Sequence, residues 1–478
     1  MKINTWLASR LGQSLVTVFI ILTLFMIFWT SPVNYWSARF TFWDTRPLLL
    51  IPFVICLFPF LVYASFLRPY IFCLIFFSFS VFRIHEVFSI LLPYQFPFIF
   101  SFLGIFSLII NVALGRITLY WQREMSFFLV FFLLVTIGVF LAYDFDISYK
   151  FWQDVFLKIF IVFFLVVWTI GDKKEYLWLL RVIISCGIIL ACITIYNKIY
   201  SISLIGGSRA SIGEKLSTLN DPNDLALTLL IPFSFGLSLL VTKSNYIFSR
   251  VMGLVSSLLI FQAILATQSR GGLLGLAGVV TYFLSHKIKS KLVLFMLGLL
   301  VVIFLYVVAN IAHREMGGAV QGIDESSMGR INAWKTAINM AIHHPFFGVG
   351  LDGFMSNYYN FAVAWNRTNP AVHSSWFGVL AEAGFPGLFL FILCVYSAMK
   401  ATRLNIQKIE AMNTITTPQK PVFQIIASGI YSGLIGFCIS STFLSQGFTW
   451  PFYIFFALSI CLTHSTKNLL KRYNDKTI

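Results

Sequence analysis

Long apolar runs separated by short polar connections dominate the chain. Each run is close to the roughly 20 residues that a helix needs to cross the hydrocarbon core of a membrane. The two least regular are 70–92, which Arg83, His85 and Glu86 interrupt, and the short run 271–285. The runs are 11–31, 47–67, 70–92, 96–115, 126–143, 155–171, 182–200, 224–242, 251–268, 271–285, 292–310, 374–398, 422–444 and 450–464. The pattern predicts an all-α integral membrane protein with about 12–14 transmembrane helices and one large loop outside the membrane.

Two polar segments interrupt this pattern on the same predicted side. The segment 311–373 is the long one, and loops of that length are usually functional. Within it, Met328–His343 repeats apolar residues at the spacing of an amphipathic helix, and we expect that helix to lie on the membrane surface. We expect the second segment, 201–223, to be too polar to be buried and too short to form a domain.

Composition supports the membrane interpretation. Hydrophobic residues make up 58% of the 478 positions and charged residues only 11%, whereas an average soluble domain carries about 25% charged residues. The mean hydropathy of +0.85 excludes a soluble enzyme and a disordered chain, because only a bilayer can cover this much apolar surface.

The charge distribution predicts how the chain is oriented. With the N-terminus inside, 21 of the 34 basic residues but only 5 of the 18 acidic residues fall on the inner side. The whole net charge of +16 therefore lies inside, which is the asymmetry that orients membrane proteins. The basic excess consequently reports topology and does not indicate a nucleic-acid partner.

Three arginines stand near the predicted outer ends of spans. Arg209 occurs in GGSRASIGEK, Arg270 in TQSRGGLLG and Arg330 in SSMGRINAW. Charged groups near a bilayer are costly and often mark functional sites, although an outer arginine can also reach up to lipid phosphates. Planar guanidiniums bind phosphate oxygens in pairs and stay charged at every relevant pH. A lipid-linked diphosphate is therefore the ligand that this group predicts.

The surroundings of Arg270 favour a ligand site over contact with lipid. Ser269 precedes it and Gly271 and Gly272 follow it, in a very short hairpin between two spans. Glycine there would allow the backbone to approach a ligand closely. For Arg209 and Arg330 the two interpretations remain equally open.

His373, in NPAVHSSWF, is the candidate base. It stands at the outer mouth of a predicted span beside Ser374 and Ser375, and a neutral imidazole can accept a proton near neutral pH. A lone histidine at a helix start can equally be structural. The pair His343 and His344 lacks the spacing of a metal site, so no metal is predicted.

Acidic and amide side chains complete the candidate group. The run NDPNDLA, which contains Asp221 and Asn223, opens the span at 224 with turn and helix-capping chemistry. The same side chains could instead orient Arg209 or bind a sugar hydroxyl of the acceptor. Glu382 is one of two ionisable residues in the central halves of the spans and is a further candidate for substrate binding.

At these residues the chain resembles the bacterial O-antigen ligase and O-antigen polymerase superfamily, whose common part is the Wzy C-terminal domain. The matching pieces stand in family order over roughly 205–390. They are Arg209 with the downstream DPNDLA, SRGG at 269–272, GRINAWKTAINMAIHHPFFGVGLDGF at 329–354 and HSSWFGVLAEAGFPGL at 373–388. Two features depart from the family: its ligases usually have about twelve spans, and its histidine is often followed by Asn, where this chain has Ser374.

The resemblance implies an inverting, metal-independent glycosyltransferase of the GT-C type that needs no cofactor. It would act at the periplasmic face of the bacterial inner membrane on an undecaprenyl-diphosphate-linked glycan, with the 311–373 loop in the periplasm. Arg209 and Arg270 then look like the diphosphate-binding arginines, His373 like the base, and Arg330 like the loop arginine of the family. Ser269, Asp221, Asn223 and Glu382 are counted as further substrate-binding candidates.

The acceptor stays open at this point. Ligation to lipid A-core, polymerisation of glycan repeats and transfer to protein all fit, with membrane lipid around the chain and no nucleic acid. A transporter of lipid-linked glycan is the alternative of a different class, but carriers usually need more ionisable groups in mid-membrane. The expected organisation is N-terminal spans over 1–200, a ligase-like core over 201–398, and C-terminal spans with a tail over 399–478.

Overall fold

A computed structural model describes residues 63, 68–87, 96–213, 217–242, 247–286, 288, 290–308, 325–363, 369–412 and 419–474. In these ranges the chain is almost entirely helical. In chain order the elements are α3 (Tyr70–Phe76), the π-helical turn η2 (Phe77–Val81), α4 (Ile84–Val87), α5 (Phe96–Ala113), α6 (Arg123–Phe140), α7 (Phe145–Phe151), η4 (Trp152–Phe156), α8 (Leu157–Thr169), α9 (Lys173–Ile199), β1 (Leu204–Ile205), β2 (Arg209–Ala210), η5 (Thr218–Asn220), α10 (Pro222–Val241), α11 (Ile247–Thr267), α12 (Arg270–Ser285), α13 (Lys291–Val308), α15 (Glu325–His343), α16 (Gly353–Phe361), α17 (Ser375–Ala411), α18 (Lys420–Ser440) and α19 (Trp450–Asn474).

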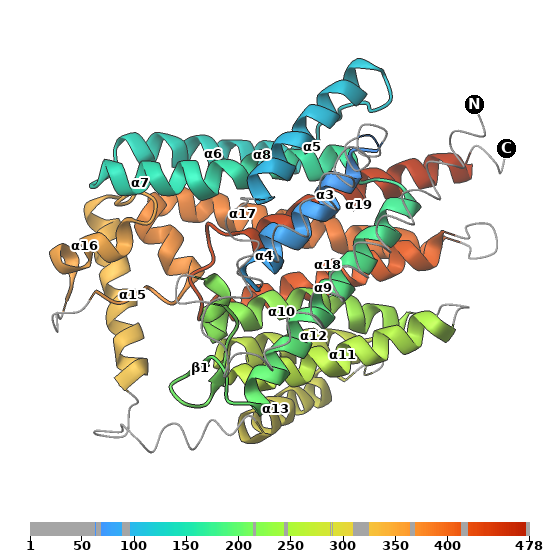
Figure 1. Ribbon diagram of the computed structural model, residues 1–478. Helices are drawn as coiled ribbons and strands as arrows, with labels where there is room; N and C mark the ends of the chain where they lie inside the picture. Colours follow the sequence, from blue (N-terminus) through green and yellow to red (C-terminus); the bar gives the residue numbers. More distant parts are fainter. Residues whose placement is uncertain are drawn as a thin grey trace, which may run out of the picture.

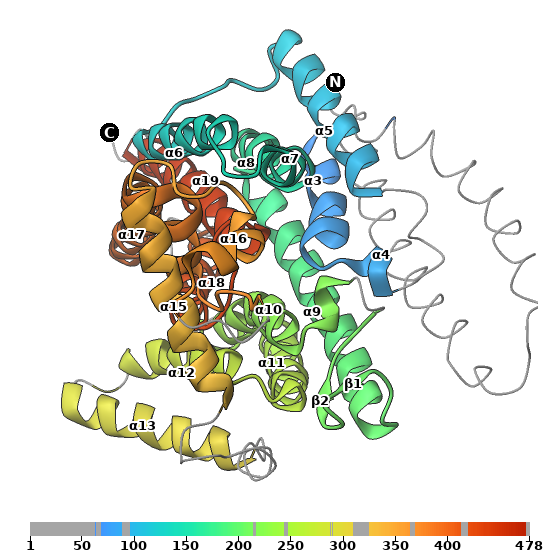
Figure 2. The same ribbon diagram turned by 90° about the vertical axis from the view of Figure 1, so that its left-hand side faces the viewer.

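The prediction of an all-α membrane protein is confirmed. Among the described residues, seven helical segments are long and apolar enough to cross a membrane, and four shorter apolar helices accompany them. Most of the long helices run side by side in one bundle (Figure 1). Helix α15 instead crosses one end of that bundle, and α16 lies beside it (Figures 1 and 2).

Most predicted spans coincide with helices to within a few residues. The helix predicted over Met328–His343 is also confirmed, as α15. The doubtful run 70–92 breaks at Phe82 and Arg83, where Arg83 has a φ of 49°, so that α3 and η2 end there and α4 follows. The predicted spans 11–31 and 47–67 lie outside the described residues, apart from Tyr63.

The bundle is held by one continuous apolar core that draws on helices from α3 to α19. Close approach between helices depends on small residues, because lipid offers no hydrophobic drive for helix association. At Gly275 on α12, a Cβ atom would overlap Ser440 Oγ of α18. Because of such close contacts, α12 packs against both α10 and α18.

A second, smaller core joins α15, α16 and the start of α17. It contains Ala333, Ala337, Met340, Val349, Phe354, Tyr358, Phe361, Val372 and Ala381. The turn after α15 docks on a kink in α17, where Gly384 has a φ of 68° and interrupts the helix. The backbone N–H of Phe385 donates to the carbonyl of Pro345 at 2.9 Å. This second core therefore fixes α15 and α16 to the end of the bundle.

Candidate functional site

The predicted site residues come from segments that are far apart in the sequence and meet at one end of the bundle. The segments are β2, the first turns of α10, α12 and α17, and helix α15 (Figures 1 and 2). Helices α9 and α11 end there, while α10, α12 and α17 begin there. The candidate site therefore lies where helix ends gather beneath α15.

Arg209 reaches the site on a short hairpin. Strands β1 and β2 pair in antiparallel fashion, with Leu204 opposite Ala210, and the turn between them uses Gly206 and Gly207 with φ values of 61° and 74°, a backbone region that glycine tolerates. Arg209 is only 8% exposed, and Ser211 is fully buried. The prediction that 201–223 is too polar to be buried is wrong for 209–212, whose polar groups find partners inside the fold, whereas 201–203 and 205–207 are exposed as expected.

Asn223 is the residue that brings the two arginine motifs together. Its Oδ1 accepts hydrogen bonds from Arg209 Nη2 at 2.7 Å and from Ser269 Oγ at 2.9 Å. Arg209 Nε also donates to the carbonyl of Thr267 at 3.2 Å. The side chains of Arg209, Asn223 and Ser269 thus form one network directly before Arg270, with Asn223 as the acceptor that joins the other two.

Arg270 is the first residue of α12. Ser269 caps that helix by accepting the backbone N–H of Gly272 at 3.2 Å. The connection from α11 is just Gln268 and Ser269, as the predicted short hairpin requires, and Gln268 has a φ of 50°. A helix N-terminus carries partial positive charge and attracts anions, so the helix and the guanidinium of Arg270 favour the same kind of ligand.

The glycines after Arg270 serve helix packing. A Cβ on Gly272 would lie 2.5 Å from the Cβ of Ala226 on α10, and one on Gly271 would lie 3.2 Å from the Cβ of Phe443. Ser440 Oγ also donates to the carbonyl of Gly271 at 2.8 Å. The structure therefore gives both glycines a role in close packing, while the approach of backbone to a ligand at this point remains a prediction.

His373 lies within electrostatic reach of Arg330 and Asp221. Burial lowers the pKa of His373, the positive charge of Arg330 lowers it further, and the negative charge of Asp221 raises it. Asp221 itself caps α10 by accepting the backbone N–H of Asn223 at 2.8 Å. Since the net shift of this pKa is downward, the imidazole is neutral near pH 7 and able to accept a proton.

The backbone of His373 is held in an uncommon conformation. Its φ of 48° lies in the left-handed region that non-glycine residues rarely adopt. On one side, Trp334 Nε1 donates to the carbonyl of Val372 at 3.1 Å and the Trp334 ring stacks on Phe377 at 5.2 Å. On the other side, the N–H of Ser375 donates to the carbonyl of Ser441 at 2.8 Å. A strained backbone conformation of this kind persists only when surrounding contacts hold it in place, and it is found most often at functional sites.

Two residues of this region were not singled out from the sequence. Gln446, in the connection from α18 to α19, donates from Nε2 to Asp224 Oδ1 at 2.6 Å, and its backbone N–H donates to Ser375 Oγ at 2.9 Å. Gln446 therefore links the start of α10 to the start of α17. The charge of Arg83 also acts on Asp224, so the break in the run 70–92 faces the site. Asp224 could be found in the NDPNDLA motif, whereas nothing in the sequence around Gln446 distinguishes it.

Glu382 lies among different partners. Its carboxylate accepts the backbone N–H groups of Asp352 and Phe354, and the N–H of Val349 donates to the carbonyl of Ala381 at 2.9 Å. These contacts fasten the turn after α15 to α17. In the structure, Glu382 therefore holds the turn after α15 against α17. Its contact with substrate remains a prediction.

The comparisons with known proteins agree with the motifs. Residues 255–392 match the O-antigen ligase family. The matched stretch contains Ser269, Arg270, Arg330 and His373, and it ends within α17, whereas Arg209 and the start of α10 precede it. A search of curated proteins finds no match to the chain. The resemblance to the O-antigen ligase and polymerase superfamily is therefore confirmed over residues 255–392.

Proposed function

Because residues 255–392 match the O-antigen ligase family within a multi-pass membrane protein, we propose a specific glycosyl transfer. The protein moves an undecaprenyl-diphosphate-linked glycan to an acceptor hydroxyl at the periplasmic face of the bacterial inner membrane. The observation that carries the proposal is the hydrogen-bond network of Arg209, Asn223 and Ser269 directly before Arg270. This network supports a diphosphate-binding site formed by two arginines.

The arginines act on the leaving group. As the bond between the anomeric carbon and the diphosphate oxygen breaks, the diphosphate departs with the electron pair and gains negative charge. Arg209, held by Asn223, and Arg270, at the N-terminus of α12, stabilise that charge. Electrostatic stabilisation of this kind is often the largest catalytic contribution.

His373 acts on the acceptor. Its neutral imidazole takes the proton of the attacking hydroxyl while the new carbon–oxygen bond forms on the opposite face of the sugar ring. One displacement inverts the anomeric centre, and no covalent intermediate is needed. General base catalysis of this kind contributes typically about 10² to 10⁴ in rate. The low pKa of His373, caused by burial and by Arg330, favours this role at neutral pH.

The face of the membrane follows from charge. The connections predicted to be cytoplasmic carry the basic excess, for example Lys173 and Lys174 before α9 and Arg403 near the end of α17. The site lies at the other end of those helices (Figure 1). The positive-inside asymmetry therefore supports a periplasmic site.

Deletion of the protein followed by analysis of surface glycans tests the function and names the acceptor. Single-repeat glycans would indicate a polymerase, free lipid-linked polymer a ligase, and unglycosylated protein an oligosaccharyltransferase. Complementation with Arg270→Ala should fail, whereas Arg250→Ala, an exposed arginine at the far end of α11, should restore the wild-type glycan. Unchanged surface glycans after deletion would refute the proposal.

Purified protein tests the chemistry. Transfer from an undecaprenyl-diphosphate glycan should continue in the presence of EDTA, since we propose that no metal takes part. Among the described residues, no three His, Cys, Asp or Glu side chains gather as a metal site. Activity that EDTA removes and a divalent cation restores would contradict the proposed mechanism.

A further inference from the structure

A groove opens between helices α12, α13, α17 and α18, away from the candidate active site. It encloses about 900 Å³, within the range of about 300 to 1,000 Å³ for ligand pockets. Helix α12 contributes residues along most of its length, α13 and α18 form the walls, and α17 contributes only its last turns, from Arg403 to Glu410. The groove therefore runs along α12 toward the end of the bundle that lies opposite His373.

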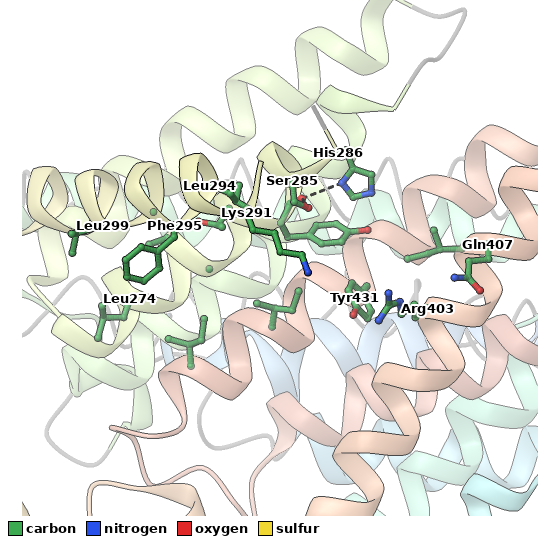
Figure 3. Close-up of a pocket in the computed structure, with 18 of the residues that line it drawn as sticks. Leu274, Ser285, His286, Lys291, Leu294, Phe295, Leu299, Arg403, Gln407 and Tyr431 are labelled. Atoms are coloured by element: carbon green, nitrogen blue, oxygen red, sulfur yellow. Dashed lines mark hydrogen bonds between the residues drawn. The ribbon is translucent and has the colours of Figure 1, made fainter. Parts of the chain in front are cut away.

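The lining changes character along the groove. One part is apolar, with Leu274 and Ala277 from α12, Leu299 from α13, and Ile435 and Ile439 from α18. The other end gathers polar and charged groups: Ser285, His286, Lys291, Arg403, Gln407, Glu410 and Tyr431. Figure 3 shows the Lys291 side chain extending toward the end where Arg403 and Gln407 lie. An apolar trough with a charged end fits an amphipathic ligand.

The charged end is basic. Lys291 and Arg403 are both exposed, and within the described part of the chain neither forms an ion pair with a carboxylate. Glu410 is the acidic residue of the lining, and it leaves one positive charge in excess. The groove therefore offers an anionic headgroup two cationic side chains and a net charge of one.

The length of the groove matches one leaflet of a bilayer. From Leu274 to Ser285 the α12 lining covers eleven helical steps, or about 16 Å at 1.5 Å per residue. Half of the roughly 30 Å hydrocarbon core is close to that value. A chain that begins at the basic end would therefore end near the middle of the membrane.

We propose that this groove binds an anionic phospholipid of the leaflet opposite the His373 end, the cytoplasmic leaflet in the proposed topology. The headgroup phosphate lies between Lys291 and Arg403, and an acyl chain follows Leu294, Ile435 and Leu299 along α12. Basic pockets between membrane helices on the cytoplasmic side bind such headgroups. The proposal goes beyond the glycosyl transfer and does not depend on it.

The polyprenyl tail of the glycan donor is the competing occupant. Arg270 and Leu274 are one turn apart on the same face of α12, so a tail could run from the diphosphate site into the apolar part. A tail would account for the apolar walls but leave the two cations at the far end without a function. A phospholipid accounts for both, and we therefore favour it.

Lipid binding by the full-length protein tests the headgroup. Native mass spectrometry in detergent would give dissociation constants for phosphatidylglycerol and for phosphatidylcholine with the same acyl chains. Each basic residue near a membrane surface contributes about 1 kcal/mol toward an anionic lipid, which corresponds to about fivefold in affinity. Arg403→Ala and Lys291→Ala should each weaken phosphatidylglycerol binding by about fivefold. Lys400→Ala is the matched control, because Lys400 lies on α17 over the Tyr396 ring and outside the groove lining.

A second variant tests the apolar part. A Cβ at Gly298 would lie 3.6 Å from Thr281 Oγ1, an ordinary contact, so Gly298→Phe can place a ring in the groove. This variant should weaken both phospholipids without changing the response to headgroup charge. Its thermal unfolding midpoint should equal that of the wild type. If Gly298→Phe does not fold, Gly298→Val takes its place and the charge variants decide the headgroup.

Three results would overturn the proposal. The first is equal affinity for phosphatidylglycerol and phosphatidylcholine. The second is phosphatidylglycerol binding that Arg403→Ala and Lys400→Ala weaken to the same extent. The third is a Gly298→Phe protein that binds phosphatidylglycerol normally but has lost affinity for undecaprenyl diphosphate, which would assign the groove to the donor tail.

Discussion

Asn223 offers a substitution that separates stability from activity. Its Oδ1 accepts hydrogen bonds from the cationic Arg209 at 2.7 Å and from Ser269 at 2.9 Å. Asn223→Ala removes both and leaves Arg209, which is 8% exposed, without this partner. A hydrogen bond to a charged group is worth about 1.5 to 3 kcal/mol and a neutral one about 0.5 to 1.5 kcal/mol. We expect Asn223→Ala to lower the free energy of unfolding by about 2 to 4 kcal/mol.

Asn223→Asp keeps the acceptor but changes the charge. A carboxylate oxygen at this position still accepts from Arg209 and Ser269, and an acidic residue in the first turn of α10 suits the helix dipole. Stability should therefore be equal to or above that of the wild type. The new negative charge offsets Arg209, however, so stabilisation of the leaving diphosphate should be lost. Loss of one such electrostatic group costs about 10² to 10³ in kcat.

The assay is transfer by purified protein from a lipid-diphosphate donor, paired with denaturation in mixed micelles. Turnover should be measured at about pH 8, because a carboxylate near His373 raises the pKa of that histidine and would otherwise add a second effect. If Asn223→Asp turns over at the wild-type rate, the charge of Arg209 does not stabilise the leaving diphosphate. An Asn223→Ala protein as stable as the wild type would refute the hydrogen-bonded network itself.

Three further predictions concern the site. Arg270→Lys should reduce glycan product nearly as much as Arg270→Ala at equal protein level, because an ammonium cannot bind phosphate through two donors in one plane; a fully active lysine variant would favour simple contact with lipid. The acid limb of the rate profile should follow the lowered pKa of His373, with activity falling as the pH drops through it, and Arg330→Gln should move that limb to higher pH; a limb that stays in place would separate the two residues. Trp334→Phe keeps the stack on Phe377 but loses the hydrogen bond to Val372, so kcat should fall about fivefold, the equivalent of about 1 kcal/mol, with donor KM unchanged; a change in KM alone would exclude a positioning role.

The sequence was informative wherever the signal is local. Hydropathy located α12 to within one residue of its start, and amphipathic spacing located α15, because both depend on the order of neighbouring side chains. The resemblance grouped Arg209, Arg270 and His373 as one set of motifs, and their shared part in catalysis remains a prediction. Their assembly at one end of the bundle then follows from helices that alternate in direction.

Other features depend on partners distant in the chain and could not be predicted. Gly272 is small because Ala226 of α10 packs against it, and no local pattern identifies that neighbour. Gln446 contacts Asp224 across 222 positions of sequence. Glu382 looked like a group for substrate, yet its carboxylate is engaged by backbone N–H groups of a turn some thirty residues earlier.

The kink at Gly384 divides α17 into a short segment at the candidate-site end and a longer helical segment that begins at Phe385. Arg403 lies eighteen residues further along, or about 27 Å at 1.5 Å per residue, which is close to the roughly 30 Å thickness of the hydrocarbon core. One rigid helix thus sets the spacing between the two polar faces of the protein. In a thinner bilayer the mismatch is relieved by tilting of the helices or by local thickening of the bilayer, since α17 cannot shorten to bring the faces closer together.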